Sequence, residues 1–263
     1  MKPLFYALLE IILEIGRIAA PQRLRRRFRD VVRVRQQYQM YRSAARQQRT
    51  LCPRWRDRYL ITNEASSSVN YEPHYTYHLS WACRLLARCP PSTHVDIGSS
   101  MQFVGMASAW LPISHYDVRQ PAISLPSLHV GTASLTSLPF DDESIESLSC
   151  MHVIEHIGLG RYGDPIDNRG DHRAAAELAR VVAPGGKLLM VVPVGRPRIA
   201  FNAHRIYCLR QVLELFPTLK LTHSALLPDG GAPSGLVEAP TAELVDRQKW
   251  GCGCFVFEKP ATD

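Results

Sequence analysis

The sequence predicts a doubly wound α/β fold built on a mostly parallel β-sheet. Short apolar segments with strand character alternate with segments of helical periodicity, which is the pattern of repeated strand–helix units. The unbroken apolar run KLLMVVPV at 187–194 is typical of a strand buried on both faces of a parallel sheet. The short strand at 94–97 ends at Gly98, where a sharp strand-to-helix turn is expected.

The same periodicities place the remaining elements. Helices are predicted at 75–87, 101–110, 171–182 and near 209–216. Strands are predicted at 94–97, 113–118, 127–133, 147–154, 187–194, near 219–225 and at 253–258. Asp171 is expected to cap the third helix, and Pro184-Gly185-Gly186 is expected to end it.

The charged residues divide the chain into two predicted domains, a basic helical N-terminal extension at 1–60 and an α/β domain at 61–263. Residues 1–60 hold fifteen Lys/Arg against four Asp/Glu, whereas the remainder holds sixteen against twenty. The chain of 263 residues carries a formal charge of +7, but its body is mildly acidic. We therefore expect no nucleic-acid partner, because nucleic-acid binding depends on a basic surface.

Residues 1–35 combine two features that suit a membrane surface. Apolar side chains recur at helical spacing in residues 1–20, and seven arginines follow between positions 23 and 35. This pattern predicts peripheral contact with an anionic membrane. A helix that packs on its own domain is the alternative. No run of eighteen apolar residues occurs, so we expect a cytoplasmic protein, with the membrane periphery as an option.

The cysteines indicate free thiols. There are seven, an odd number, and no CxxC pair occurs. Cys252 and Cys254 lie two apart in an apolar run, so on a strand both would face the same side. Buried thiols explain the pattern better than disulfides or zinc, and we expect a reducing compartment and no metal site.

One pair of acidic residues indicates an adenosine cofactor. Asp96 precedes Gly98 at the first strand–helix turn, and Asp117 closes the second strand at a spacing near that of a ribose-binding carboxylate. Ser100 and Phe103 stand where a dinucleotide-binding loop needs glycines, which argues against NAD. S-adenosylmethionine has no phosphate and suits this turn better. Alternatively, Asp96 caps a turn and Asp117 is a surface strand end.

Three further blocks carry a resemblance to a known family. They are 134–142 (SLTSLPFDD), 145–156 (IESLSCMHVIEH) and 177–193 (ELARVVAPGGKLLMVVP). In this order, over roughly residues 93–195, they resemble class I S-adenosylmethionine-dependent methyltransferases. The segments 94–99 (HVDIGS), 155–167 (EHIGLGRYGDPID) and 201–206 (FNAHRI) resemble an uncharacterised methyltransferase-like family, a domain of unknown function found near surface-polysaccharide genes. The resemblance implies a Rossmann-like sheet of seven strands.

The resemblance also implies roles for individual residues in binding S-adenosylmethionine. Asp96 and Gly98 would border the methionine moiety, with the backbone of Ser99 and Ser100. Asp117 would bind the ribose hydroxyls. Ser134 stands where many relatives carry an Asp for the adenine amino group. Met151 and His152 would line the methyl-donor site.

The expected reaction is methylation of an oxygen on a small molecule or sugar, with a nitrogen as the alternative acceptor atom. His156 is the preferred base, with His152, Glu155 and His204 as further catalytic candidates, because a histidine titrates near neutral pH. The predicted acceptor-binding residues are Arg161, Tyr162, Asp164, Asn202, His204 and Arg205, together with Arg196 and Arg198. The alternative function is a cofactor-dead binding protein of the same fold at a membrane surface.

A remote alternative comes from the H-x-x-E-H pattern of His152, Glu155 and His156, which inverzincin proteases use to bind zinc. The pattern requires a helix, so that both histidines reach one metal ion. The preceding residues predict a strand and glycines follow, so we expect no protease. Glu155 and His156 can instead hold the neighbouring loop by hydrogen bonds.

Overall fold

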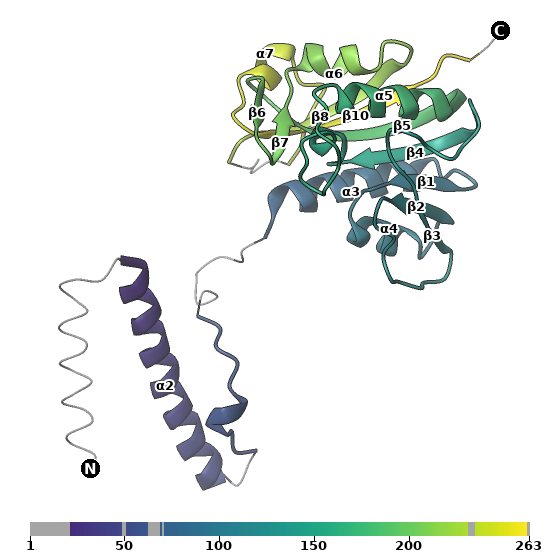
Figure 1. The fold of residues 1–263 in the computed structure, drawn as a ribbon. Coiled ribbons are helices and arrows are strands. Elements are labelled where there is room, and N and C mark those ends of the chain that lie inside the picture. The colour runs from purple at the N-terminus through teal and green to yellow at the C-terminus, as the bar shows by residue number, and fades with distance from the viewer. Residues whose placement is uncertain (1–21, 49–50, 63–68, 70, 231–234, 262–263) are drawn as a thin grey trace. The chain divides into compact units, whose positions relative to one another are not determined.

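The computed structural model describes residues 22–48, 51–62, 69, 71–230 and 235–261. The chain divides into two compact units, Met1–Tyr71 and Glu72–Asp263 (Figure 1). The predicted amphipathic stretch at 1–20 lies outside the described residues. Among the described helices, none is long and apolar enough to span a membrane.

The first unit contains a long basic helix, α2 (Gln22–Gln48), and a short 3₁₀ helix, η1 (Trp55–Asp57). The Trp55 ring lies edge-on to Tyr38 of α2, with ring centroids 4.9 Å apart. The guanidinium groups of Arg35 and Arg58 lie over the same ring, at 5.3 and 4.9 Å from its centroid. Cation–π contacts therefore connect α2 to the segment that follows it.

The second unit, Glu72–Asp263, is built of alternating helices and strands. Its helices are α3 (Pro73–Arg88), α4 (Met101–Ala107), η2 (Ile154–His156), α5 (Gly170–Val181), α6 (Leu209–Leu215) and α7 (Ala242–Asp246). Its main strands are β1 (His94–Ile97), β2 (Ile113–Asp117), β3 (Leu128–Thr132), β4 (Ile145–Met151), β5 (Val182–Val194), β8 (Lys220–Leu227), β9 (Val237–Glu238) and β10 (Gly251–Glu258). A separate hairpin joins β6 (Arg198–Ala200) to β7 (His204–Ile206).

The main sheet has the strand order β3-β2-β1-β4-β5-β10-β8-β9. Strands β1 to β5 pair in parallel, and β10 runs antiparallel to both β5 and β8. Helices α5, α6 and α7 cover one face, and α3 and α4 cover the other (Figure 1). The predicted doubly wound, mostly parallel sheet is confirmed, with the two-residue β9 added at one edge. The chain changes direction across the sheet between β1 and β4, which is where such folds bind ligands.

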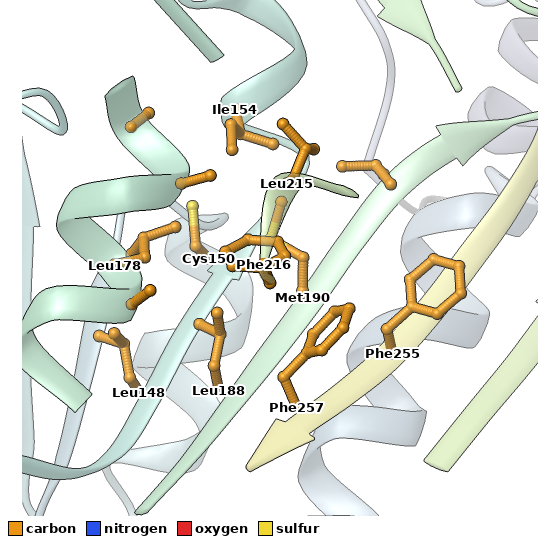
Figure 2. Packing of buried hydrophobic residues seen from close by; sticks show 14 of the residues in the cluster. Leu148, Cys150, Ile154, Leu178, Leu188, Met190, Leu215, Phe216, Phe255 and Phe257 are labelled. Atoms are coloured by element: carbon orange, nitrogen blue, oxygen red, sulfur yellow. The ribbon is translucent and has the colours of Figure 1, made fainter. Parts of the chain in front are cut away.

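A buried apolar layer lies on each side of the sheet. On one side, Leu178 and Phe216 pack with Cys150 and Met190 (Figure 2). On the other side, α3 and α4 pack against a cluster that includes Met151, Cys252 and Cys254. Neighbouring residues of β4 therefore face opposite layers, as strand geometry requires. Cys252 and Cys254 share one face, as predicted.

Several predicted details are wrong. The strand predicted at 147–154 spans 145–151, and Ile154 belongs to η2 instead. Asp171 does not cap α5, because the N-cap is Arg169 and the Asp171 carboxylate is buried against Tyr207 and Arg205. The Pro184–Gly186 turn lies inside β5, which begins directly after α5 and shifts register against β4. The helix predicted at 101–110 ends at Ala107.

Candidate functional site

The ends of β1, β2 and β4 meet at one open pocket. It holds about 520 Å³ of space when its mouth is included. Its wall is formed by the following residues: Ile97, Gly98, Tyr116, Asp117, Val118, Arg119, Ala133, Leu135, His152, Val153, His156, Ile157 and Tyr162. The pocket thus lies at the carboxyl edge of the parallel strands, where the order of the sheet reverses.

Asp96 organises the first turn from beneath the pocket. Its carboxylate is fully buried and accepts hydrogen bonds from the Ser149 hydroxyl, from His115 Nδ1 at 2.8 Å and from the Ser99 backbone at 3.1 Å. These donors come from β4, from β2 and from the turn itself. The Asp96 side chain therefore fixes the turn rather than reaching into the pocket.

The turn after β1 brings backbone to the pocket wall. Gly98 has φ +70°, and a Cβ there would lie 3.0 Å from Val153 Cγ1, so a side chain would both strain the backbone and crowd the wall. The Ser99 hydroxyl accepts the Met151 backbone N–H at 3.1 Å, which joins the turn to β4. Ser100 caps α4 by accepting the Phe103 backbone N–H.

Asp117 and Ser134 differ in their relation to the pocket. Asp117 lines it, and its Oδ1 accepts the Arg119 backbone N–H at 2.8 Å, which holds the carboxylate at the rim. Ser134 is exposed and its hydroxyl is hydrogen-bonded to Thr136 at 3.0 Å. Its neighbours Ala133 and Leu135 line the pocket, whereas Ser134 is absent from the wall.

His152, Glu155 and His156 form a hydrogen-bonded group at the end of β4. His152 has φ +58°, and its Nδ1 lies 2.9 Å from Glu155 Oε1. His156 Nδ1 lies 2.6 Å from the Ala203 carbonyl, and its Nε2 lies 3.7 Å from Glu155 Oε1. His152 precedes η2, so the two histidines do not share the α-helix that an inverzincin needs. The structure therefore gives the protease reading no support.

The loop after η2 closes one side of the pocket. The Asp164 carboxylate accepts the backbone N–H groups of Gly158 at 2.7 Å and Tyr162 at 3.2 Å, so it holds the loop. The Tyr162 ring lines the pocket, with the guanidinium groups of Arg119 and Arg161 at 4.6 and 5.2 Å from its centroid.

The β6–β7 hairpin carries several of the residues predicted to bind the acceptor. It brings only some of them to the side of the pocket near His156. His204 lies 6.4 Å from His156 and stacks on Trp250 at 5.8 Å between ring centroids. Burial lowers the pKa of His204. Asn202 is exposed. Arg205 is buried and donates to the Ile157 carbonyl at 2.6 Å, which supports the loop from inside.

The two other arginines predicted for the acceptor site are exposed. Arg198 donates to the Lys249 carbonyl at 2.6 Å, and the Arg196 backbone N–H bonds to the Gln248 carbonyl at 2.9 Å. Both contacts join this segment to the residues before β10.

Sequence reasoning missed a cluster beside His152. His74, in the first turn of α3, and Cys252, near the start of β10, each have one possible metal-ligand atom within 4.8 Å of the corresponding atoms of the other two residues. Burial lowers the pKa of the adjacent His78 to about 3, so this imidazole is neutral at pH 7. His74 and His78 are one turn apart on α3, but His152 and Cys252 come from distant stretches of chain that no spacing pattern connects to them.

Comparisons with known proteins agree with the fold. A family model described as Caenorhabditis protein of unknown function, DUF268, matches residues 140–220. No curated protein matches the chain. The solved structure of N-methyltransferase NodS from Bradyrhizobium japonicum WM9, in complex with S-adenosyl-L-homocysteine, is 14% identical. The likeness covers 74% of this chain and 94% of NodS, with a TM-score of 0.51.

Two further solved structures are similar to the same extent. The MccD protein is 13% identical, with a TM-score of 0.51. The likeness covers 73% of this chain and 100% of the MccD chain. A candidate methyltransferase from Bacillus halodurans C-125 is 12% identical, with a TM-score of 0.50. The likeness covers 70% of this chain and 99% of the methyltransferase. At these identities the likeness shows a fold shared with methyltransferases, the Rossmann-like α/β sheet.

Proposed function

We propose that the chain is an S-adenosylmethionine-dependent methyltransferase. The observation that carries the proposal is the pocket at the switch point of the sheet, where Gly98 and Asp117 share one wall with His152 and His156. A carboxylate at the end of β2 and a glycine turn after β1 suit a nucleoside cofactor. The fold shared with NodS, which was solved with S-adenosyl-L-homocysteine, supports the same cofactor.

The chain's residues fit the cofactor in distinct ways. Asp117 would accept hydrogen bonds from the ribose hydroxyls, and the backbone at Gly98 would approach the methionine moiety where a side chain would not fit. Asp96 and Ser99 would act indirectly, by holding the turn in shape. When bound, S-adenosylmethionine supplies a methyl group on a sulfonium, so positioning of the acceptor contributes much of the rate.

The proposed acceptor is a hydroxyl of a small molecule or sugar, and His156 is the proposed base. His156 Nδ1 lies 2.6 Å from the Ala203 carbonyl, to which it would donate, so Nε2 would be the basic nitrogen. Arg161 Nη1, 3.3 Å from Nδ1, donates to the same carbonyl at 3.0 Å. Nε2 would take the proton that the acceptor hydroxyl loses as its oxygen is methylated. His204 and the 46% exposed Trp250 extend this side with flat surfaces.

Binding of S-adenosyl-L-homocysteine to the full chain, measured by calorimetry, tests the cofactor. Asp117→Ala removes a charged acceptor, so we expect a loss of about 1.5–3 kcal/mol, or roughly 10–150-fold in affinity. Asp141→Ala, at an exposed carboxylate before β4, is the matched control and should bind like the wild type. If the chain does not bind millimolar S-adenosyl-L-homocysteine, the methyltransferase proposal is wrong and a cofactor-dead binding protein is favoured.

The same experiment separates cofactor binding from proton transfer. His156→Ala should keep the affinity for S-adenosyl-L-homocysteine and lower turnover by roughly 10²–10⁴-fold. Turnover is measured with labelled methyl donor and extracts, which also identifies the methylated product. Full turnover in this variant would leave His156 as an anchor of the Ala203 backbone only.

A second proposal concerns location. We propose a cytoplasmic protein that contacts an anionic membrane through residues 1–35, supported by the fifteen Lys/Arg against four Asp/Glu in residues 1–60. Of the α2 residues whose burial is described, only Ala45 is buried, and the exposed ones include Arg29, Arg33 and Arg35. A role near surface-polysaccharide synthesis remains part of the same proposal and depends on the acceptor being a sugar.

A further inference from the structure

Three potential metal ligands meet at the carboxyl edge of the sheet, on the side covered by α3. His152 follows the last residue of β4, Cys252 is the second residue of β10, and His74 lies in the first turn of α3. Their ligand atoms all lie within 4.8 Å of one another. Glu72 caps α3 by accepting the Tyr75 backbone N–H at 2.6 Å, which fixes the turn that carries His74.

The separation of two of these atoms matches a metal site. His152 Nε2 lies 3.6 Å from Cys252 Sγ. With Zn–N of about 2.0–2.1 Å and Zn–S of about 2.3 Å at a tetrahedral angle, the two ligand atoms would lie roughly 3.6 Å apart. A thiol–imidazole hydrogen bond can have the same length, so the surroundings of the pair must decide between the two.

The surroundings favour a metal. His152 Nδ1 faces the Glu155 carboxylate at 2.9 Å, to which it can donate, and Nε2 is directed at Cys252 Sγ. The His74 ring lies against the Trp250 ring, with centroids 4.7 Å apart. Histidines that bind metals almost always donate their second ring N–H to a carboxylate or to the backbone, because this bond orients the ring.

Two buried polar atoms beside the group have no hydrogen-bond partner among the described residues: Glu155 Oε2 and His78 Nε2. The His78 ring lies edge-on to His152, with centroids 5.0 Å apart, and its Nδ1 faces the His74 carbonyl at 2.6 Å. Its Nε2 is therefore a buried lone pair. Unsatisfied buried polar atoms are rare in native proteins, and a bound ion is one of the few features that explain them.

We propose that His74, His152 and Cys252 bind one Zn²⁺ ion. Two imidazoles and a thiolate form a borderline-soft donor set that suits Zn²⁺ and disfavours Mg²⁺ and Ca²⁺, which require oxygen ligands. Three protein ligands leave the fourth tetrahedral position open, as in catalytic zinc sites. His152 also lines the pocket, so the ion would border it. This inference does not depend on the proposed methyltransferase activity.

The test measures Zn²⁺ binding to the full chain after removal of metal by a chelator. We expect one Zn²⁺ per chain by elemental mass spectrometry and calorimetry, and no heat with Mg²⁺. Glu155→Gln should weaken Zn²⁺ affinity by roughly 10–100-fold, the usual effect of losing a residue that orients a ligand. Cys252→Ser and His74→Gln remove ligands and should weaken it further. Co²⁺ should give a thiolate charge-transfer absorption that Cys252→Ser abolishes.

Cys150→Ser is the matched control. Cys150 is as fully buried as Cys252, but it belongs to the cluster on the opposite face of the sheet. This variant should bind Zn²⁺ like the wild type. If Cys252→Ser fails to fold by circular dichroism, His74→Gln decides, because His74 lies at the edge of the cluster with 9% exposure.

Less than one Zn²⁺ per chain, or equal affinity in the ligand variants and the wild type, would overturn the metal site. The contact between His152 and Cys252 would then be a thiol–imidazole hydrogen bond. S-adenosyl-L-homocysteine binding is measured on the same samples. If the chain binds Zn²⁺ but not S-adenosyl-L-homocysteine, only the methyltransferase proposal is contradicted. If it binds S-adenosyl-L-homocysteine but not Zn²⁺, only the metal site is contradicted.

Discussion

A chain of buried polar residues joins the central strands beneath the pocket. The Ser149 hydroxyl donates to Asp96, so it accepts from His94 Nε2, which lies 2.9 Å away. His94 Nδ1 is then the acceptor for the Ser147 hydroxyl at 2.8 Å. Each group in this chain has its partner, and the histidine has to be neutral for the pattern to hold.

His94 makes stability depend on pH. Burial lowers the pKa of His94 from 6.5 to about 4 in the folded protein, although nearby Asp96 opposes the shift. Below about pH 6.5 the unfolded chain binds this proton and the folded chain does not. The contribution of neutral His94 to the free energy of unfolding is therefore complete above pH 6.5. It is lost as the pH falls towards 4, and its size is on the order of 3 kcal/mol.

Denaturant unfolding at pH 7, 6 and 5 measures this contribution. His94→Gln, which cannot titrate, should flatten the dependence of the free energy of unfolding on pH. His172→Gln, at an exposed position of α5, is the control and should keep the wild-type slope. An unchanged slope in His94→Gln would show that other groups cause the acid sensitivity.

At the scale of elements, the strands with apolar runs could be predicted closely. The bounds predicted for β1 are those observed. β2 ends one residue before its predicted end, and β3 is one residue shorter at each end. The hairpin of β6 and β7, with three residues in each strand, and β9 with two were not predicted, because such short polar strands carry no periodicity. Their pairing depends on tertiary contacts.

The loop after η2 could be predicted to exist from its glycines, but its anchoring could not. The Gly158 backbone bonds to Asp164 and Asp167, and Arg205 reaches the loop from β7. Asp164 and Arg205 were predicted to bind the acceptor. In the structure their polar atoms hold the loop that carries Tyr162, so sequence spacing located the right region and the fold determined which groups face the pocket.

Gly158→Ala should destabilise the loop more than Gly163→Ala. Both glycines have positive φ, so both variants lose roughly 1–2 kcal/mol through backbone strain. A Cβ at Gly158 would in addition lie 2.1 Å from the Asp167 carbonyl oxygen, whereas nothing lies within 4 Å of one at Gly163. Denaturant unfolding should therefore place Gly158→Ala at least about 1 kcal/mol below Gly163→Ala. Equal losses would mean that the loop shifts to relieve the contact.

At the scale of the whole molecule, chemistry-bearing residues from distant stretches converge at one edge of the sheet. The switch-point pocket and the role of Gly98 could be predicted, because a strand–turn–helix pattern determines them locally. The meeting of His74, His152 and Cys252 could not be predicted, because it depends on β10 pairing between β5 and β8, which brings the Cys252 side chain within 3.6 Å of His152. Only the completed sheet places these residues together.

The charge asymmetry of the two units predicts how the whole protein behaves at a membrane. If residues 1–35 contact anionic lipid, the full chain should co-sediment with vesicles containing phosphatidylserine and not with neutral vesicles. Each basic residue near such a surface contributes about 1 kcal/mol at most, and binding should fall as salt screens the charges. Replacing Arg25, Arg26, Arg27 and Arg29 together by Gln should abolish co-sedimentation.

Replacing the same four arginines by Lys is the matched control for the membrane experiment. It keeps the charge and should keep most of the binding, because attraction to a charged surface does not depend on guanidinium geometry. The Gln variant should still bind S-adenosyl-L-homocysteine like the wild type, since the pocket belongs entirely to the unit Glu72–Asp263. Equal binding of the Gln variant and the wild type to anionic vesicles would contradict the membrane proposal and favour a helical extension that packs on protein.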